Sequence, residues 1–349
     1  MGDLGILVTN LHQEQMYFTD IAKAGCNKGM HVYLFLPTTI DANKKIAKGK
    51  RYCDITNQWV NETFSIPLFI YDRCFYENET TYKKYFPSLS WLKSQPDIVF
   101  LGHGLPNKWL VYKLLSKDPT IYSFLPETVL LSNRSQVSSM FKKHHSILFK
   151  PVSGSQGKGI FVLSKENDSF SLLAKKEGEI FFKRLTEKQV EHLLYKVMKR
   201  YKYLVQPFLS LTNQQQQPFD LRVFLQKDDQ GQWQEIGRGL RTGKVGDFTS
   251  NLAGGGTVDC YDDWLRSLSS TAQVVLRKNL KELIERIPTM LEKHYPLFEL
   301  GLDFGFDKEG RLWLLEVNSK PGRKVILTSF PNKENFLANG PINYCLFLQ

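Results

Sequence analysis

Three oxygen-bearing side chains near the end of the chain could bind a divalent metal ion. Glu316 and Asn318 stand two residues apart in an apolar, β-type segment, so both side chains point to one face of a strand. If a hairpin closes with Phe306 opposite Arg311, Asp303 joins that face, and a register shifted by one residue would break the arrangement. Carboxylate and amide oxygens suit Mg²⁺. The alternative is an amphipathic hairpin that exposes its polar residues to solvent.

A second group of residues could hold phosphate. A β-type segment ends at Lys150, a loop rich in glycine and serine follows, and a second β-type segment starts near Ile160. Glycines let backbone N–H groups approach phosphate oxygens closely, and Lys158 adds positive charge. A strand rather than a helix follows the loop, so the pattern is neither a Walker A loop nor a Rossmann fingerprint. It is typical of a glycine-rich hairpin that covers a nucleotide, and an ordinary flexible hairpin is the alternative.

Together and in this order, the two motifs resemble those of the ATP-grasp superfamily. Residues 150–160 are similar to its lysine and glycine-rich loop, and residues 314–322 are similar to its closing Glu-x-Asn-x-x-Pro-Gly signature. Residues 219–224 resemble the Asp-x-Arg strand of the RimK-type glutamate ligases. Residues 241–256 resemble their Arg…Ser-Asn…Gly-Gly segment.

The full set of sequence motifs is most similar to that of the YheC/YheD-type branch, described as endospore coat-associated proteins of spore-forming Firmicutes. Residues 70–73, 125–128 and 316–323 carry this likeness, and the resemblance covers roughly residues 65–330. It implies an α/β (α+β) chain with the ATP-grasp fold, in which two α+β lobes sandwich ATP behind an N-terminal pre-ATP-grasp α/β domain. The expected domains are 1–125, 126–205 (with the glycine-rich loop) and 206–349 (with the metal site).

The resemblance also implies nucleotide-binding roles. Lys150 would contact the α- and β-phosphates, and the segment that begins at Gln206 would read adenine, with the Gln206 side chain accepting from the 6-amino group. Lys108 resembles a further ATP-grasp lysine, although Asn107 precedes it where the family has Asp; a surface lysine at a helix start is the alternative. The expected nucleotide-binding residues are Lys108, Lys150, Ser153, Gly154, Ser155, Gln156, Gly157, Gly159, Gln206, Phe208 and Asp220.

Arginines are expected at the reacting phosphate. Arg222 and Arg241 would clamp the γ-phosphate, because guanidinium forks match phosphate oxygens; structural salt bridges are the alternative. Asp220 would bond the ribose or orient Arg222, and Asn251 and the turn around Gly255 would bound an acyl-phosphate pocket. The remaining expected residues are Asp303, Glu316 and Asn318 for the metal, and Lys320 and Arg323 for the acceptor's carboxylate or the transferred phosphate.

The implied reaction is an ATP-dependent ligation of a carboxylate to an amine through an acyl phosphate, with release of ADP and phosphate. It uses ATP and one or two Mg²⁺ ions, which Mn²⁺ could replace, and its substrates would be small molecules or peptides. No protein nucleophile is required, since Mg²⁺, lysine and arginine manage the charge. One alternative is an ATP-grasp kinase that phosphorylates a hydroxyl group. Another is a non-catalytic, ATP-binding coat protein.

Composition agrees with an enzyme of this kind. The chain has 349 residues, of which 42% are hydrophobic and 23% charged, as in globular proteins. No apolar run is long enough to span a bilayer, and residues 1–10 lack a secretory signal pattern, so we expect no membrane partner and a cytoplasmic location. Five scattered cysteines argue against a zinc site or a disulfide scaffold.

The formal net charge of +11 could indicate a nucleic-acid partner. However, the basic residues do not form one block, and nucleotide phosphates with an acidic substrate would also favour positive potential. The interpretation is therefore that nucleic acid is not the partner. The oligomeric state is left open.

Hydrophobic periodicity predicts the elements that must position these residues. Residues 4–9, 31–36 and 96–102 have the pattern of strands in an N-terminal α/β lobe. Helices are expected over residues 133–143, 187–200 and most of 262–291.

Overall fold

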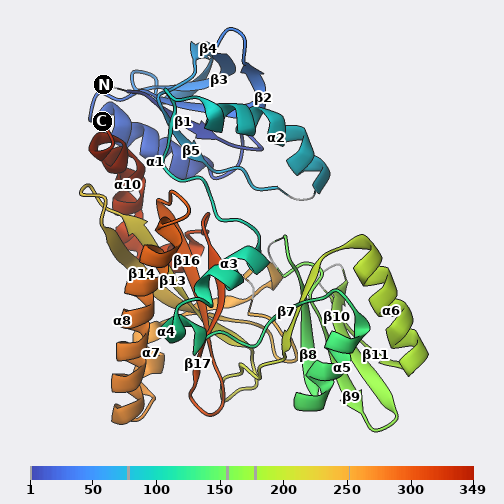
Figure 1. The fold of residues 1–349 in the computed structure, drawn as a ribbon. Coiled ribbons are helices and arrows are strands. Elements are labelled where there is room, and N and C mark those ends of the chain that lie inside the picture. Colours follow the sequence, from blue (N-terminus) through green and yellow to red (C-terminus); the bar gives the residue numbers. More distant parts are fainter. Residues whose placement is uncertain (1, 77–78, 155–156, 177–178, 251) are drawn as a thin grey trace.

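Three β-sheets form the framework of the molecule (Figure 1). The computed structural model describes residues 2–76, 79–154, 157–176, 179–250 and 252–349. One sheet builds an N-terminal lobe, and the other two build the lobes below it in Figure 1. Within the described residues, no helix has the length and apolar character needed to cross a membrane.

The N-terminal sheet has the strand order β4-β3-β2-β1-β5-β6 and is parallel from β2 to β6. Its apolar strand β1 lies between layers of helices: α1 and α10 pack on one side, and α2 packs on the other. The predicted strands are confirmed, and an antiparallel ribbon, β3–β4, extends the sheet beyond them. The elements are β1 (Leu4–Leu7), α1 (Gln15–Cys26), β2 (Val32–Asp41), β3 (Ile46–Cys53), β4 (Gln58–Ser65), β5 (Phe69–Asp72), α2 (Glu79–Ser94), β6 (Val99–Phe100) and α10 (Glu334–Phe347).

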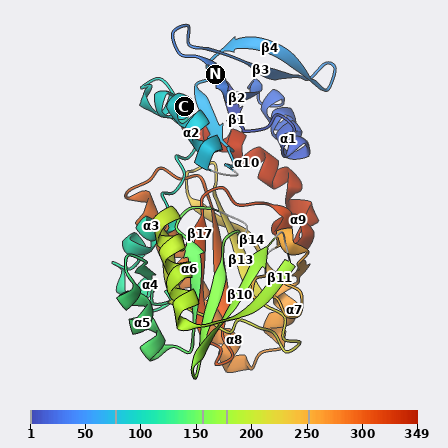
Figure 2. The same ribbon diagram turned by 90° about the vertical axis from the view of Figure 1, so that its right-hand side faces the viewer.

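The central lobe is an antiparallel sheet of order β11-β10-β9-β8-β12-β7, covered by α5 and α6 (Figure 2). Both helices begin with capping boxes, Asn133 with Gln136 and Thr186 with Gln189, which explains why their starts could be predicted. Strands β8 and β9 form the predicted hairpin around the glycine-rich loop. The elements are β7 (Val129–Leu130), α5 (Arg134–Lys143), β8 (Ser146–Pro151), β9 (Phe161–Glu166), β10 (Ser169–Lys176), β11 (Glu179–Leu185), α6 (Glu187–Arg200) and β12 (Tyr203–Pro207).

The third sheet is antiparallel with the order β15-β14-β13-β16-β17; α3, α4, α7 and α8 cover one face, and α9 with α10 covers part of the other. The helix expected over most of 262–291 is confirmed as α8, which the Ser269 hydroxyl caps; the first residues of that range form a separate short helix, α7, and residues 267–269 lie between the two. The elements are α3 (Lys108–Leu115), α4 (Pro119–Tyr122), β13 (Phe219–Lys227), β14 (Trp233–Thr242), β15 (Thr257–Asp259), α7 (Tyr261–Arg266), α8 (Ser270–Glu292), β16 (Glu299–Phe306), β17 (Leu312–Asn318) and α9 (Lys324–Ser329).

The predicted register of the β16–β17 hairpin is wrong by one residue. Phe306 pairs with Leu312 instead of Arg311, and the ladder then shifts between Asp303 and Phe304. The extra residue in this β-bulge is Leu315. Because the bulge compensates for the shifted turn, Asp303 lies directly opposite Glu316.

The chain does not build its lobes strictly in order. Helices α3 and α4 precede the central sheet in sequence, yet they pack on the core of the third sheet. Helix α10 returns from the third lobe to pack against α1 (Figure 1). The domain boundaries at residues 125 and 205 therefore remain predictions.

Candidate active site between the lobes

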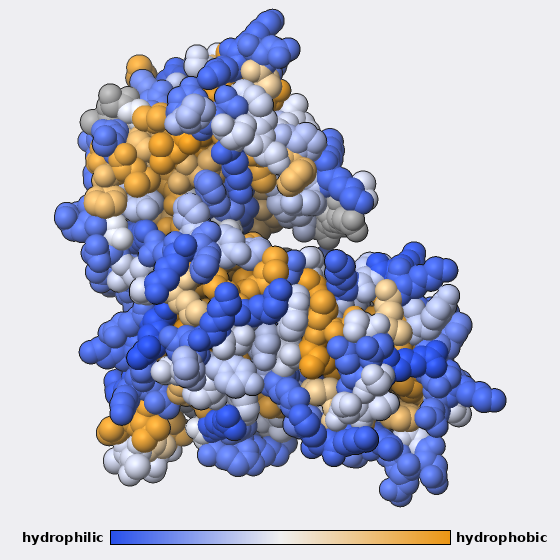
Figure 3. All heavy atoms as spheres, viewed as in Figure 1, coloured by the Kyte–Doolittle hydropathy of each residue, from blue (hydrophilic) through white to orange (hydrophobic). Residues whose placement is uncertain are grey.

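A cavity of about 1150 Å³ lies where the three lobes meet. The space-filling view shows the surface hollowed between the N-terminal lobe and the lobes below it (Figure 3). Strand alternation aims side chains into the cavity: Ile147 and Phe149 of β8 face the core, whereas Leu148 and Lys150 face the cavity. The predicted site residues that line it are Lys150, Gly157, Gln206, Phe208, Asp220, Arg222, Arg241, Asp303, Glu316, Asn318 and Lys320.

Two lysines from different elements approach Glu316. The Lys150 ammonium donates to the backbone oxygen of Leu315 at 3.2 Å, and burial lowers the pKa of Lys150 to about 8. Lys108 begins helix α3, whose N-cap is Asn107. Its Nζ lies 3.5 Å from Glu316 Oε1 and donates to the Gly154 oxygen at 2.5 Å. Lys108 thus joins the glycine-rich loop to the carboxylate at the cavity margin.

The loop itself has the backbone that its glycines permit. Gly154 and Gly157 have φ of 120° and 70°, in the left-handed region that favours glycine. Gly157 lines the cavity, whereas Ser153 and Gly159 do not, and both are exposed. Two further predicted contacts, Ser155 and Gln156, fall outside the described residues.

The three predicted metal ligands come to the same face of the third sheet. Asp303 pairs with Glu316 across the ladder, and Asn318 lies two residues further along β17 and lines the same cavity. Two carboxylates and an amide oxygen form a donor set that fits Mg²⁺. Across the described residues, His, Cys, Asp and Glu side chains alone form no group of three or more suited to a metal ion, so such a site needs the Asn318 amide.

Alternating charges run across the floor of this sheet. Arg222 donates to both oxygens of Asp303, with Nη2 at 3.0 Å from Oδ2, and Arg241 Nη2 lies 2.9 Å from the same oxygen. Burial would raise the pKa of Asp303, but the two guanidinium groups hold it below its ordinary value. Each arginine keeps further N–H donors for a ligand, since a guanidinium has five.

The suggestion that Asp220 orients Arg222 is wrong. Asp220 accepts from Arg241 at 2.6 and 2.7 Å, and it also accepts from the Ser250 hydroxyl. Burial raises the pKa of Asp220 in spite of Arg241. Asp220 therefore positions Arg241 of the neighbouring strand β14 and not Arg222 of its own strand β13. Asn251, which follows Ser250, falls outside the described residues.

The expected adenine end is apolar with one amide. The Gln206 side chain donates to the Thr128 hydroxyl at 2.7 Å, which leaves its oxygen as an acceptor. Leu148 and Leu173 of the central sheet and Ile160 at the end of the glycine-rich loop line the cavity, and none of the three was predicted as a site residue. The alternation of β8 could have identified Leu148, because it shares a face with Lys150.

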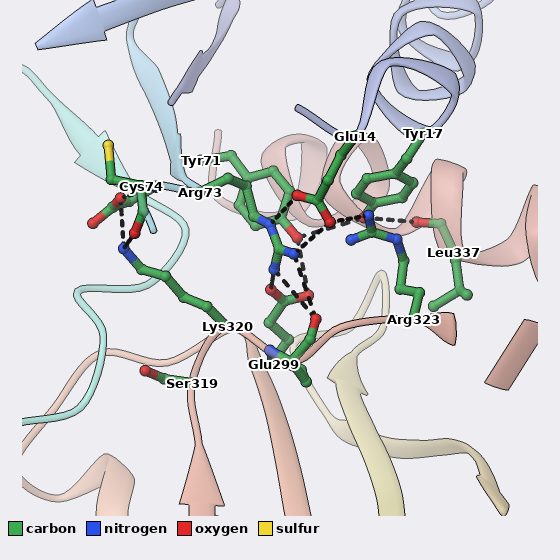
Figure 4. Close-up of polar contacts among 12 residues, drawn as sticks. Glu14, Tyr17, Tyr71, Arg73, Cys74, Glu299, Ser319, Lys320, Arg323 and Leu337 are labelled. Atoms are coloured by element: carbon green, nitrogen blue, oxygen red, sulfur yellow. Dashed lines mark hydrogen bonds and ion pairs between the residues drawn. The ribbon is translucent and has the colours of Figure 1, made fainter. Parts of the chain in front are cut away.

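Arg323 and Gly255 are not in the cavity lining. Arg323 is buried instead in a polar network between the N-terminal and third lobes (Figure 4). Its guanidinium lies 3.3 Å from the centre of the Tyr17 ring and donates to Glu14. Expecting it to bind substrate was wrong, because a motif position next to the metal strand does not reveal which way the chain turns.

Arg73 is the centre of the same network and is 0% exposed. It donates to Glu14 at 2.9 Å and to Glu299 at 2.5 Å, and the Tyr71 hydroxyl donates to Glu299 at 2.9 Å (Figure 4). Glu14 and Tyr71 belong to the N-terminal lobe, and Glu299 begins β16. A buried, fully paired arginine therefore fixes the N-terminal lobe over the cavity.

The three sheets and the cavity between them define the ATP-grasp fold. D-alanyl-alanine synthetase A from Vibrio cholerae O1 biovar eltor str. N16961 has a similar structure, with a TM-score of 0.57 at 13% identity over 99% of each chain. That degree of identity shows the fold alone.

The chain belongs to the YheC/D like ATP-grasp family, whose model matches residues 97–348. It is 32% identical to the endospore coat-associated protein YheC of Bacillus subtilis (strain 168), over all of this chain and 96% of that protein. It is 24% identical to the endospore coat-associated protein YheD of the same strain, over 91% of this chain and 70% of that one.

Proposed function

We propose that the protein is an ATP-dependent carboxylate–amine ligase. The observation that carries this proposal is the meeting of Lys150, Lys108 and the Asp303–Glu316 pair at one margin of the cavity. Two lysines beside paired carboxylates suit a nucleotide whose phosphates bind both ammonium groups and a metal ion. ATP is the proposed co-substrate, and the loop around Gly157 would cover its phosphates.

The chain's own residues account for the charge that the reaction moves. A carboxylate oxygen of the substrate attacks the γ-phosphorus, the bond to the β–γ bridging oxygen breaks, and ADP leaves. An amine nitrogen then attacks the acyl carbon, phosphate leaves, and the nitrogen loses a proton. Arg222 and Arg241 stabilise the transferring phosphoryl group with their remaining N–H donors. Mg²⁺ held by Asp303, Glu316 and Asn318 would supply further neutralisation of phosphate charge.

Trapping the acyl phosphate tests the reaction without knowledge of the natural amine. The protein is incubated with Mg-ATP, a mixture of carboxylic acids and amino acids, and hydroxylamine, which converts an acyl phosphate to a hydroxamate. We expect hydroxamate together with equal amounts of ADP and phosphate. A phosphorylated product without hydroxamate would instead identify a kinase. If the protein binds ATP but forms no product even when a spore-cell extract supplies the substrates, the coat-protein alternative is favoured.

The relatives' names bear on location. We propose that the protein acts in the cytoplasm of a spore-forming cell and that it associates with the endospore coat; the names of YheC and YheD, endospore coat-associated proteins, support the second part. Fractionation of spores with an antibody against the protein would test this location.

A further inference from the structure

The N-terminal side of the cavity is lined by aromatic rings. Phe75, Tyr76, Tyr82 and Phe86 line it from the loop after β5 and from α2. We call these four residues the aromatic recess. The ring centres of Tyr76 and Tyr82 are 5.2 Å apart, and those of Tyr82 and Phe86 are 5.4 Å apart, so these three rings form a continuous wall.

Three of these four rings are substantially exposed to solvent. Phe75, Tyr82 and Phe86 are 40%, 41% and 48% exposed. Helix α2 already has a buried face, formed by Tyr85, Leu89 and Leu92. Tyr82 and Phe86 stand four residues apart beside this buried face and extend it to the cavity, which Leu89 lines as well. The apolar stripe of the helix is therefore wider than the core covers, and its exposed part gains free energy when an apolar group covers it.

Positive charge lies beside the aromatic recess. Lys93, at the end of α2, lines the cavity and donates to the His103 oxygen at 2.7 Å. Lys320 lies 5.8 Å from the Tyr76 ring centre and binds Asp72 at 2.7 Å. One carboxylate against two ammonium groups leaves one net positive charge, and both lysines retain N–H donors, since an ammonium has three. The Tyr76 hydroxyl oxygen is buried, and the thiol of Cys74 is the group beside it.

The same lysine adjoins the candidate reaction centre. Pro321, next to Lys320, and Arg222 both flank Gly301: a Cβ atom there would lie 2.8 Å from Pro321 Cβ and 3.3 Å from Arg222 Nη1. Only a residue without a side chain lets the two approach so closely. The backbone next to Lys320 therefore lies beside an arginine that we propose to clamp the γ-phosphate, and both residues line the cavity.

We infer that the aromatic recess binds the side chain of the carboxylate substrate, and that this side chain is aromatic or branched and apolar. The substrate class is a hydrophobic amino acid, or a peptide that ends in one, with its carboxylate toward Lys320 and Arg222. The inference rests on the proposed ligase function. It assigns the specificity of the reaction to Tyr82 and Phe86, which touch the substrate but not the nucleotide.

Binding of small acids tests the recess separately from the chemistry. Racemic N-acetylphenylalanine, N-acetylleucine, N-acetylglutamate and N-acetylphenylalanine amide are titrated calorimetrically into the full chain with Mg²⁺ and a non-hydrolysable ATP analogue. We expect the two apolar acids to bind at least tenfold more tightly than either N-acetylglutamate or the amide. Phe86→Ala should weaken N-acetylphenylalanine at least fivefold. Phe336→Ala, at a ring that is 47% exposed elsewhere, should leave its affinity unchanged.

The hydroxylamine assay with the same acids separates the two proposals. Binding of the apolar acids without any hydroxamate supports the recess and contradicts the ligase. Hydroxamate formed from N-acetylglutamate as readily as from N-acetylphenylalanine supports the ligase and overturns the recess. Equal affinity of Phe86→Ala and the parent protein for N-acetylphenylalanine also overturns it, with the melting temperature of each variant as the check on folding.

Discussion

The ammonium group of Lys150 lies 3.2 Å from the backbone oxygen of Leu315, the residue that forms the bulge of β17. A lysine of the central sheet thus contacts the irregularity that brings Glu316 opposite Asp303 on the third sheet. The two halves of the candidate site are therefore connected directly, across the cavity. Any ligand that draws Lys150 away from Leu315 acts on both lobes at once.

Replacing Lys150 should weaken nucleotide binding. Loss of a charge-assisted hydrogen bond costs about 1.5–3 kcal/mol, so Lys150→Ala should raise the Kd for Mg-ATP about 10- to 150-fold. Calorimetric titration measures this, and Lys165→Ala on neighbouring β9, an exposed position, is the control. An affinity equal to the parent's would remove Lys150 from the nucleotide site.

Nucleotide affinity should fall in mildly alkaline solution. Burial lowers the pKa of Lys150 to about 8, so the side chain is already charged below that pH. In that range Lys150 contributes no pH dependence to nucleotide binding. Above pH 8 the neutral amine must take up a proton when phosphate binds, and the affinity should fall by up to about tenfold per pH unit. Titrations between pH 7 and 9.5 would measure this, and Lys150→Arg should remove the slope.

The metal assignment predicts a loss of activity without a loss of stability. Glu316 and Asn318 lie on the cavity side of an edge strand, so Glu316→Ala with Asn318→Ala should abolish Mg²⁺-dependent turnover and leave the nucleotide-free melting temperature nearly unchanged. Glu309→Ala, in the exposed turn of the same hairpin, should keep full activity. Turnover in the double variant at the parent rate would contradict the metal assignment.

Asp303 should behave differently, because it holds two buried guanidinium groups. Asp303→Ala leaves Arg222 and Arg241 without this carboxylate, and breaking a buried pair costs about 3–5 kcal/mol of unfolding free energy. Denaturation in urea would measure the loss. Asp263→Ala, which breaks an exposed pair with Arg266, should cost about 1 kcal/mol or less. Similar losses for both variants would contradict the buried network.

Arg73 should control the attachment of the N-terminal lobe. Arg73→Ala leaves Glu14 with Arg323 alone and Glu299 without its arginine partner, and burial already raises the pKa of Glu299 against the effect of Arg73. We expect the backbone amides of α1 and β5 to exchange hydrogen faster in the variant than in the parent. Exchange in the central sheet should be the same in both proteins. Equal exchange rates of α1 and β5 in the variant and the parent would show that the network does not hold the lobe.

Local signals predicted much of this structure. Capping residues at Asn133 and Thr186 and the glycine-rich hairpin were readable because each depends on residues that are close in sequence. The register around Asp303 was not, since it depends on a bulge that no residue type in the hairpin announces. The resemblance indicated which residues are polar at the site, yet the partners of Asp220 and Arg323 lie 21 and 309 positions away, and only the fold brings them together.

Helix α10 has a consequence for how the protein is made. Four of its side chains, Ala338, Ile342, Tyr344 and Cys345, complete the core that covers one side of the first sheet. While the chain is being synthesised, the part of that side that α10 covers stays open until residues 338–345 have left the ribosome, after the strands of all three sheets. The N-terminal lobe is therefore completed only after the other two sheets have been made, and a ribosome that stalls before α10 would release a chain with this apolar surface open to aggregation.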